Sequence, residues 1–329
     1  MKRIGLVLGA GGVTGGAFHA GVLAALHEFA GWDARTSEVV IGTSAGSLAG
    51  AVVRAGLSGD DLLRRATGRP LSAEGRRVTN GLAPPPTGFP LRPERGATGP
   101  GLRPRLRSTA PESLARMALR PWDVRPAAVM SALLPPGRIS TSMITGGIEP
   151  LFGRRWPEDP LWICAVRLDN GRRVVFGRDD SPTNRPTVGE AVAASCAIPG
   201  FFEPVVIDGV RHVDGGVHSP TNLDLLGGLG LDLVVVSSPM SQAGRTLPRA
   251  SADWAVRRFC RAQLDREAVA VRRKGTPVLA FQPTSEVAAV MGLNALDPAR
   301  RKEVAERTYA SARQRLQLAD VADRLALLG

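Results

Sequence analysis

The stretch VVIGTSAGSLAG, at residues 39–50, constrains the fold of this chain more than any other part of the sequence. An apolar run ends at Ile41, a Gly-x-Ser-x-Gly turn follows, and small and apolar residues typical of a helix come next. In the nucleophile elbow, a serine lies in a strained strand-to-helix turn, and only small residues fit two positions away on either side. Gly42 and Gly46 occupy those positions, so the pattern predicts Ser44 as a nucleophile. The alternative is that Ser44 is an ordinary helix N-cap.

The elements around this turn predict an α/β fold. A buried strand is expected at residues 3–8, a glycine-rich loop leads into a helix over 16–30, and a second strand at 39–41 precedes a helix over 45–56. This order produces parallel strands covered by helices. Further along the chain we expect hairpins at 161–177 and 204–216, strands at 231–238 and 277–281, and helices at 112–119, 124–134, 187–199, 252–273, 298–317 and 319–328.

We expect one domain over residues 1–329, because no internal repeat divides the chain. A stretch at about 68–110 is rich in Pro, Gly and Arg and lacks apolar periodicity, which predicts a loop or disordered insertion. Such a segment could be a lid, a basic surface arm or a linker without a role. The region at about 284–329 is expected to be helical.

The glycine-rich segment LGAGGVTGGAFHAGVL, at residues 8–23, offers the N–H donors that a serine nucleophile needs for its oxyanion. A loop that leads into a helix can turn backbone N–H groups inward, beside the positive end of the helix. Gly11 and Gly12 are the predicted donors. A dinucleotide-binding loop is a rival interpretation, but the third glycine of that fingerprint falls on Thr14, and the second strand ends in the serine turn instead of an acidic residue.

Two kinds of side chain are candidates for the base that would activate Ser44. His218 follows Asp214 by four residues and would complete a Ser–Asp–His order. Asp214 acting alone is the other candidate, because the two glycines after it allow close approach of the backbone. Asp208 also precedes a glycine, but it lies between two short apolar runs, where a hairpin turn is expected. Asp214 is therefore the stronger candidate.

The charge and cysteine content limit the partners and the compartment. Lys+Arg number 42 and Asp+Glu 30, and the net charge of +12 attracts the chain to anionic surfaces. Aromatic residues make up 5% of the chain and no base-reading motif occurs, so we do not expect nucleic acid as a partner. The three separated cysteines favour a reducing compartment and have no metal-ligand spacing. No apolar run reaches the roughly 18 residues that span a bilayer, and glycines interrupt the N-terminal stretch that imitates a signal peptide.

The helix expected over 252–273 is a candidate membrane-binding surface. Its cations are interleaved with Trp254, Phe259 and Leu264, and a basic amphipathic helix can lie on an anionic interface. A core-packed helix with a solvated face has the same pattern. The cations of this helix are Arg257, Arg258, Arg261, Arg266, Arg272, Arg273 and Lys274.

The cysteine content leads us to expect a cytoplasmic protein, and peripheral contact with a membrane is a hypothesis. The oligomeric state does not follow from the sequence.

Four blocks give the chain a resemblance to the patatin-like phospholipase family. They are GAGGVTGGAFHAGVL, GTSAGS, ASCAIPGFFEPV and VDGGVHSPTN, in the family's order over about residues 5–222. The resemblance implies a modified α/β-hydrolase fold, three-layer α/β/α, with a mainly parallel central sheet. It implies a Ser–Asp dyad without a catalytic histidine, with Ser44 as nucleophile, Asp214 as base and the glycine loop as oxyanion hole. It also implies cleavage of lipid or phospholipid acyl esters, of phospholipase A, lipase or esterase type, through an acyl-enzyme and without metal or cofactor.

The glycine loop departs from the pattern Gly-Gly-Gly-x-Arg/Lys-Gly that is common in this family. Ala10 stands at the first glycine and Thr14 at the basic position. Alanine is compatible with the loop if its φ is negative. The missing basic side chain removes a charge near the site. A catalytically weak or silent lipid-binding relative is therefore the alternative to an active hydrolase.

Overall fold

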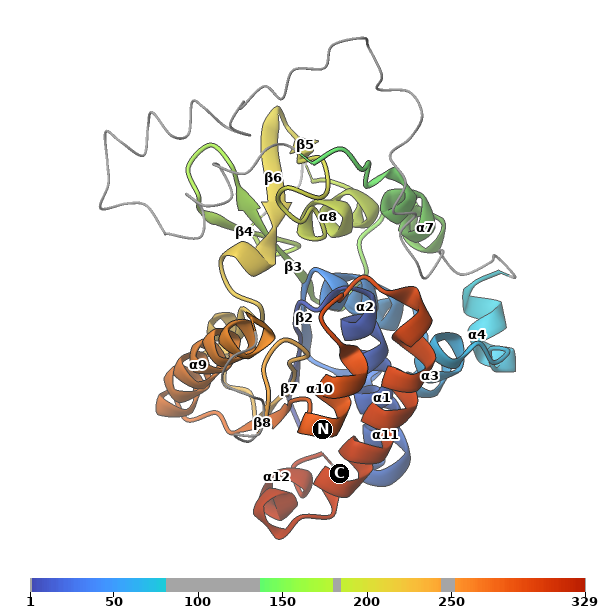
Figure 1. Ribbon diagram of the computed structural model, residues 1–329, viewed down its shortest axis with the longest axis vertical. Helices are drawn as coiled ribbons and strands as arrows, with labels where there is room; N and C mark the ends of the chain where they lie inside the picture. Colours follow the sequence, from blue (N-terminus) through green and yellow to red (C-terminus); the bar gives the residue numbers. More distant parts are fainter. Residues whose placement is uncertain (1, 81–136, 180–184, 244–251, 329) are drawn as a thin grey trace.

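A mixed β-sheet forms the centre of the molecule (Figure 1). The computed structural model describes residues 2–80, 137–179, 185–243 and 252–328, and within these ranges eight strands form one sheet in the order β5-β6-β3-β2-β1-β7-β8, with β4 paired to β3. The run from β3 to β8 is parallel, whereas β4, β5 and β6 are joined antiparallel, which confirms the predicted mainly parallel sheet. The strands are β1 (Ile4–Leu8), β2 (Val39–Thr43), β3 (Leu161–Arg167), β4 (Arg173–Phe176), β5 (Val205–Ile207), β6 (Val210–Asp214), β7 (Leu233–Ser237) and β8 (Val278–Phe281).

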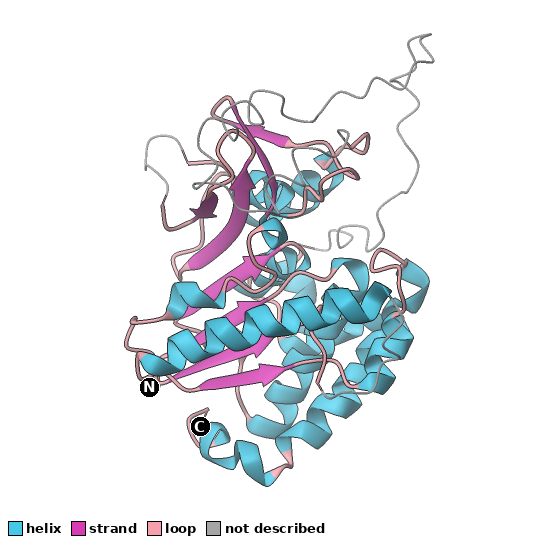
Figure 2. Cartoon of the chain, turned by 60° about the vertical axis from the view of Figure 1, so that its left-hand side comes forward, coloured by secondary structure: helices cyan, strands magenta, loops and turns pink. Residues whose placement is uncertain are grey.

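Helices cover both faces of the sheet, which makes the fold a three-layer α/β/α arrangement. Helix α9 crosses one face, and the other helices gather on the opposite face or at its margin (Figure 2). The helices are α1 (Gly12–Ala30), α2 (Ala45–Arg54), α3 (Gly59–Thr67), α4 (Ala73–Val78), α7 (Ser142–Phe152), α8 (Val188–Ser195), α9 (Ala252–Arg273), α10 (Ser285–Met291), α11 (Arg301–Leu316) and α12 (Ala322–Leu325). Short 3₁₀ turns include η3 (Gly215–Val217), η4 (Leu223–Leu226), η5 (Pro298–Arg300) and η6 (Ala319–Val321).

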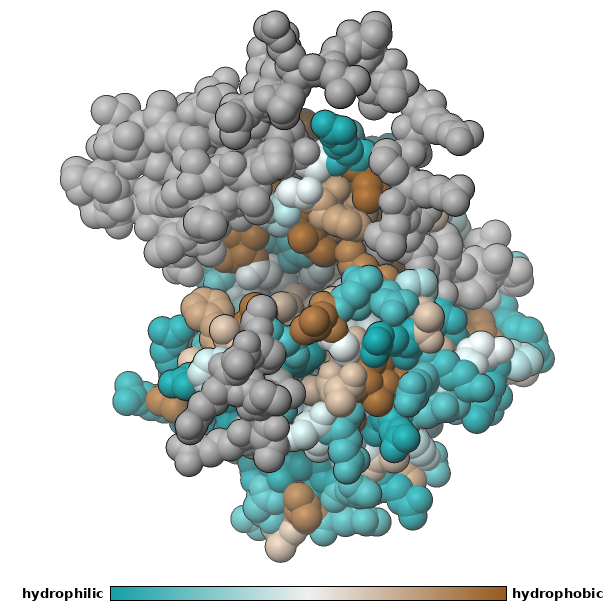
Figure 3. Space-filling view, viewed as in Figure 1, coloured by the Kyte–Doolittle hydropathy of each residue, from teal (hydrophilic) through white to brown (hydrophobic). Residues whose placement is uncertain are grey.

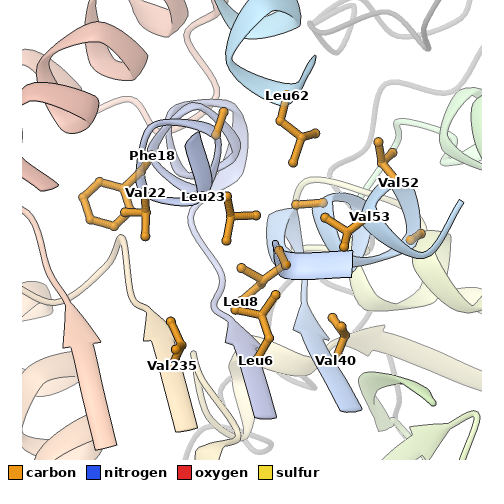
Figure 4. Close-up of a cluster of buried hydrophobic side chains, with 14 of the residues drawn as sticks. Leu6, Leu8, Phe18, Val22, Leu23, Val40, Val52, Val53, Leu62 and Val235 are labelled. Atoms are coloured by element: carbon orange, nitrogen blue, oxygen red, sulfur yellow. The ribbon is translucent and has the colours of Figure 1, made fainter. Parts of the chain in front are cut away.

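Strand side chains alternate between two apolar cores. In β1, Leu6 and Leu8 pack against α1 and α2, as the close-up in Figure 4 shows, while Val7 faces the opposite core under α9. Because both faces are buried, the central strands are apolar along their whole length instead of alternating with polar residues. The larger core also contains Phe18 and Leu23 of α1, which lie directly over the sheet.

Most predicted elements lie where the sequence places them, with differences at three places, and helices α3 and α7 are two elements that the sequence analysis does not predict. Helix α1 begins at Gly12, so part of the expected glycine loop is the first helical turn. Within the segment expected to be an insertion, residues 73–78 form α4, while residues 81–110 and the helices expected at 112–119 and 124–134 lie outside the described residues. The helix expected over 319–328 is shorter, a 3₁₀ turn followed by α12.

The core packing predicts a large cost for shortening Leu23. This side chain is 1% exposed, and Leu23→Ala should lower the free energy of unfolding by about 2–5 kcal/mol, because burial is lost and a cavity remains. The matched control is Leu293→Ala, since Leu293 is 81% exposed and its truncation should change the stability by less than about 0.5 kcal/mol. Urea denaturation followed by circular dichroism measures both. Equal losses would contradict the assignment of the core.

Candidate active site

Ser44 occupies a strained turn between β2 and α2. Its backbone has φ 54° and ψ −121°, a conformation that residues other than glycine rarely adopt. A Cβ atom on Gly42 would lie 2.4 Å from the Cα of Ser47, and one on Gly46 would lie 1.9 Å from the carbonyl oxygen of Leu8. Both glycines are therefore required by close packing of strand and helix. Ser44 stands at the N-cap position, but its side chain makes no capping hydrogen bond, so the N-cap alternative does not explain it.

The register of β3 brings Ser44 and Asp214 together. Strand β2 pairs with residues 161–164 of β3, and β6 pairs with residues 165–167. Strand β4 overlaps both of these segments in register, so β2 and β6 share the other edge of β3. Because β2 runs parallel to β3 and β6 runs antiparallel, their C-terminal ends meet head to head on this edge. Ser44 follows the end of β2, and Asp214 ends β6.

The Asp214 carboxyl group is buried and directly beside the serine. Burial raises the pKa of Asp214 to about 6, against the lowering effect of hydrogen bonds from the Ser44 side chain and from the backbone of Gly216. The Gly216 N–H donates to Oδ1 at 2.7 Å, which fixes the orientation of the carboxyl group. A carboxylate with a pKa near 6 is a stronger base than an exposed aspartate and is still ionised at neutral pH.

Ser195 and Cys196, at the end of α8, complete the surroundings of the serine. The backbone N–H of Ser44 donates to the Ser195 hydroxyl at 2.9 Å, and that hydroxyl donates to the carbonyl oxygen of Cys164 at 2.7 Å. Burial and the charge of Asp214 raise the pKa of Cys196, so its thiol stays protonated and is a poor nucleophile. The sequence does not predict that Ser195 and Cys196 lie beside Ser44, although both residues belong to the block ASCAIPGFFEPV.

The N-terminus of α1 points toward the same place. Gly11 is the N-cap, and Gly12 has φ 61°, where a Cβ atom would lie 2.7 Å from the carbonyl oxygen of Ala295. Among the described residues, the N–H groups of Gly11 and Gly12 have no backbone acceptor, as expected for a first helical turn. Ala10 lies outside the positive-φ region, so alanine is accommodated there. Thr14 is buried, and its N–H donates to the Ala295 carbonyl at 3.0 Å.

The described interactions of His19 and His218 involve groups other than Ser44 and Asp214. His19 is fully buried, its Nε2–H donates to the carbonyl of Gly9 at 2.8 Å, and its Nδ1 accepts from the Ser237 hydroxyl at 2.8 Å. Burial lowers the pKa of His19 to about 4, so its imidazole is neutral. Its hydrogen bond to Gly9 holds the glycine loop in position. His218 acts electrostatically on Asp224, and it is not among the groups that shift the pKa of Asp214. The electrostatics therefore favour Asp214 over His218 as the base, and the role of His218 stays a prediction.

The loop after Asp214 ties the pieces of the site together. The side-chain amide of Asn222 donates to the Thr43 hydroxyl at 3.0 Å, one residue before the serine. The carbonyl of Pro220 accepts from the backbone N–H of Ala10 at 2.8 Å. Glu267 of α9 accepts hydrogen bonds of 2.6 Å from two hydroxyl groups of the same loop. The block VDGGVHSPTN therefore supports the glycine loop, the serine turn and α9 at once.

A cavity of about 110 Å³ opens beside Ser44. Its wall is mostly apolar and comes from α1, α2 and α3, and it includes Gly12 and Cys196. Two arginines, Arg65 and Arg301, also line this wall. Within the described ranges, no group of three or more His, Cys, Asp or Glu side chains is placed to hold a metal ion. The apolar lining side chains are Val13, Ala17, Ala20, Ala45, Leu48, Ala49, Val52, Leu62, Ala66 and Ile144.

Comparison with known proteins identifies the family. The sequence profile of the patatin-like phospholipases matches residues 6–226, about two thirds of the chain and all four of its characteristic blocks. The chain therefore belongs to the patatin-like phospholipase family, whose members as a class hydrolyse lipid acyl esters. Two solved structures are similar over 96% of this chain: VipD from Legionella pneumophila, with 14% identity and a TM-score of 0.42, and the type III effector protein ExoU, with 20% identity and a TM-score of 0.35. The chain spans 66% of the first and 53% of the second.

The buried Asp214 predicts how the reactivity of Ser44 depends on pH. The raised pKa means that Asp214 becomes protonated as the pH falls through about 6, and it can then no longer accept the serine proton. The rate at which a fluorophosphonate labels Ser44 should be level above this pH and fall about tenfold per unit below it. Asp214→Asn, which cannot titrate, should react slowly at every pH. A midpoint near 4 would contradict burial as the cause.

Proposed function

We propose that this chain is a serine-dependent lipid acyl hydrolase that works through a Ser44–Asp214 dyad. One observation carries the proposal: a serine in a strained turn lies beside a buried carboxyl group at the opening of an apolar cavity. The strain holds the hydroxyl in place for reaction, the carboxylate accepts its proton, and the cavity accepts a hydrocarbon chain. An ordinary structural serine needs none of these three features.

In the first half of the reaction, the Asp214 carboxylate takes the proton of Ser44 while Oγ attacks the acyl carbonyl carbon. The carbonyl oxygen becomes an oxyanion, and the N–H groups of Gly11 and Gly12 donate hydrogen bonds to it. Helices α1 and α2 both begin at this point, so the positive ends of two helix dipoles stabilise the same charge. When the tetrahedral intermediate collapses, protonated Asp214 returns the proton to the leaving alcohol, and an acyl-serine remains.

In the second half, Asp214 takes a proton from water, and the resulting hydroxide attacks the acyl-serine carbonyl. The same backbone N–H groups hold the second oxyanion. Collapse releases the fatty acid, and Asp214 returns its proton to Ser44 Oγ. No step requires a histidine, because one carboxylate with a raised pKa takes and returns the proton in both halves.

The cavity lining supports lipid acyl esters as the substrate class. Alanine, leucine and valine side chains from three helices offer contact to a hydrocarbon chain but few hydrogen bonds to a polar acyl group. Phospholipase, lipase and esterase activities all fit this arrangement. A silent lipid-binding relative is the second candidate, because Thr14 replaces the basic residue that is common in the family.

Substitution of the dyad distinguishes the active hydrolase from the silent relative. The wild-type chain should be labelled by a fluorophosphonate at Ser44, and Ser44→Ala should remove both the label and ester hydrolysis. Asp214→Asn should lower hydrolysis by at least about 100-fold, because the base is lost. Ser142→Ala, at an exposed serine of α7, is the matched control and should leave activity unchanged. A folded wild-type protein that is neither labelled nor active would establish the silent relative.

We also propose that α9 makes peripheral contact with anionic membranes. The inner side of α9 packs into the core through Leu264. Arg257 is buried and pairs with Asp253, so it does not belong to the basic surface that the sequence predicts. The outer side keeps an exposed aromatic residue, Phe259, which is 61% exposed, among the remaining cations. Exposed apolar groups among positive charges suit the interface of an anionic bilayer. No described helix is long and apolar enough to cross a membrane.

Co-sedimentation with vesicles tests the contact through α9. Binding to phosphatidylglycerol vesicles should exceed binding to phosphatidylcholine vesicles and should fall at high salt, because the attraction of exposed charges is screened. Phe259→Ser should weaken binding several-fold by removing the exposed ring. The control is Leu318→Ser, an exposed apolar residue outside α9. Equal loss in both variants would assign the binding to general surface hydrophobicity.

A further inference from the structure

Ser195, the last residue of α8, interrupts the hydrogen-bond ladder between β2 and β3. In this parallel ladder the N–H of Val40 donates to the carbonyl of Pro160 at 3.0 Å. Continued by four residues along each strand, the same pattern would join the Ser44 N–H directly to the Cys164 carbonyl. The Ser195 hydroxyl stands between these two groups instead. It accepts from the Ser44 N–H at 2.9 Å and donates to the Cys164 carbonyl at 2.7 Å.

This inserted hydroxyl marks the point where the chain leaves the sheet for the strained turn. Ser44 has φ 54°, and strain of this kind persists only where neighbouring contacts hold the backbone. The carbonyl of Ser44 is held from within α2, because it accepts from the Ser47 hydroxyl at 2.7 Å and from the Ser47 N–H at 2.8 Å. The N–H of Ser44 is held from outside the turn, by Ser195. The two sides of the nucleophile therefore have separate supports.

The Cys164 carbonyl, at the far end of this bridge, also borders the residue that follows the base. A Cβ atom on Gly215 would lie 2.2 Å from that carbonyl oxygen. Strand β6 pairs its last residue, Asp214, with the residue after Cys164. One carbonyl of β3 thus lies between the end of β6 and the end of β2. Through it, the Ser195 hydroxyl fixes the backbone of Ser44 relative to the strand that carries Asp214.

The bridge lies in the interior of the protein. Ser195 and Cys164 are both 0% exposed, and Ser44 is 4% exposed. Hydrophilic residues cover much of the described surface in the lower half of Figure 3, around α10 and α11, whereas these polar groups are buried beneath the surface. Removal of a buried hydroxyl leaves its partners unsatisfied. Without Ser195, the backbone N–H of Ser44 therefore gains by moving toward another acceptor.

We propose that Ser195 is a positioning residue for the reaction of Ser44, because its hydroxyl sets the backbone of the nucleophile relative to Asp214. The inference rests on the proposed function, in which Ser44 attacks the acyl ester. Ser195 is not among the described residues that line the cavity, so it acts through Ser44 and not by binding substrate. Its hydroxyl also engages the Ser44 N–H, which leaves the oxyanion to other N–H groups, those of Gly11 and Gly12.

Hydrolysis of p-nitrophenyl butyrate tests this role. Ser195→Ala should lower kcat about 10- to 100-fold and leave KM nearly unchanged, because a small displacement of the nucleophile slows the reaction without altering the cavity. Ser195→Thr keeps the hydroxyl and should recover most of kcat. The matched control is Ser37→Ala: Ser37 is 3% exposed, and its hydroxyl donates to the Ala34 carbonyl at 2.6 Å. This control removes a buried hydroxyl that makes no bond to Ser44 and should leave kcat unchanged.

A purely structural hydroxyl would give a different result. Ser195→Ala would then lower the stability in urea denaturation but keep the wild-type kcat once folded, and this outcome would overturn the proposal. A folded Ser195→Thr protein as slow as Ser195→Ala would overturn it as well. If Ser195→Ala does not fold, Ser195→Cys decides, because a thiol is similar in shape but a weak hydrogen-bond partner. A lowered kcat in Ser195→Cys supports the proposal, and a wild-type kcat contradicts it.

Hydrogen exchange of the Ser44 amide, followed by NMR, tests the bridge without any substrate. If the wild-type chain neither hydrolyses esters nor takes a fluorophosphonate label, the proposed function fails, and this measurement still decides whether Ser195 holds Ser44. The amide should exchange at least about tenfold faster in Ser195→Ala than in the wild type, because its acceptor is lost. It should exchange at the wild-type rate in Ser37→Ala. Equal rates in the wild type and Ser195→Ala would show that the hydroxyl does not hold the nucleophile.

Discussion

The candidate site depends on one edge of β3. The first half of this edge pairs with β2 and the second half with β6, and the two partners run in opposite directions. Their C-terminal ends therefore meet, and the residues that end them are drawn together without any contact between distant loops. The switch from parallel to antiparallel pairing on a single strand is what places a carboxyl group beside a serine. Ser195 secures the junction, because its hydroxyl links the Ser44 N–H to the carbonyl of β3 at the same point.

Around this junction, buried polar groups hold the backbone in place. His19 fixes the loop before α1 through Gly9, Asn222 fixes the strand that leads into the serine through Thr43, and Glu267 ties the loop after Asp214 to α9. Each of these three side chains meets a partner inside the protein, so its burial is compensated and its position becomes well defined. The strained backbone of Ser44 is sustained by these neighbours and by the close approach that Gly42 and Gly46 permit.

The sequence predicts the local features well and the long-range ones poorly. The sequence predicts the serine turn at Gly42, Ser44 and Gly46, because the steric need for glycine is local to the turn. It also predicts the hairpin through Asp208 from the residues of its turn. Ser195 and His19 could not be assigned, because their partners lie far away along the chain and become neighbours only through the sheet order. Arg257 shows the limit of charge patterns: the sequence places it on a basic surface, whereas its pairing with Asp253 allows it to be buried. The sequence likewise shows that Thr14 replaces a basic residue. It does not predict that Arg65 of α3 and Arg301 of α11 line the cavity, because no sequence motif connects the two helices.

The head-to-head meeting of β2 and β6 also couples chemistry to the completion of folding. The serine turn belongs to the first part of the chain, whereas Asp214 lies beside it only where β6 is paired with β3. A chain that has not yet paired β6 with β3 carries the serine without its carboxylate partner. On the proposed mechanism, such a chain lacks the base that activates Ser44. On that mechanism, hydrolysis requires the paired edge of β3 and β6 and not the serine turn alone.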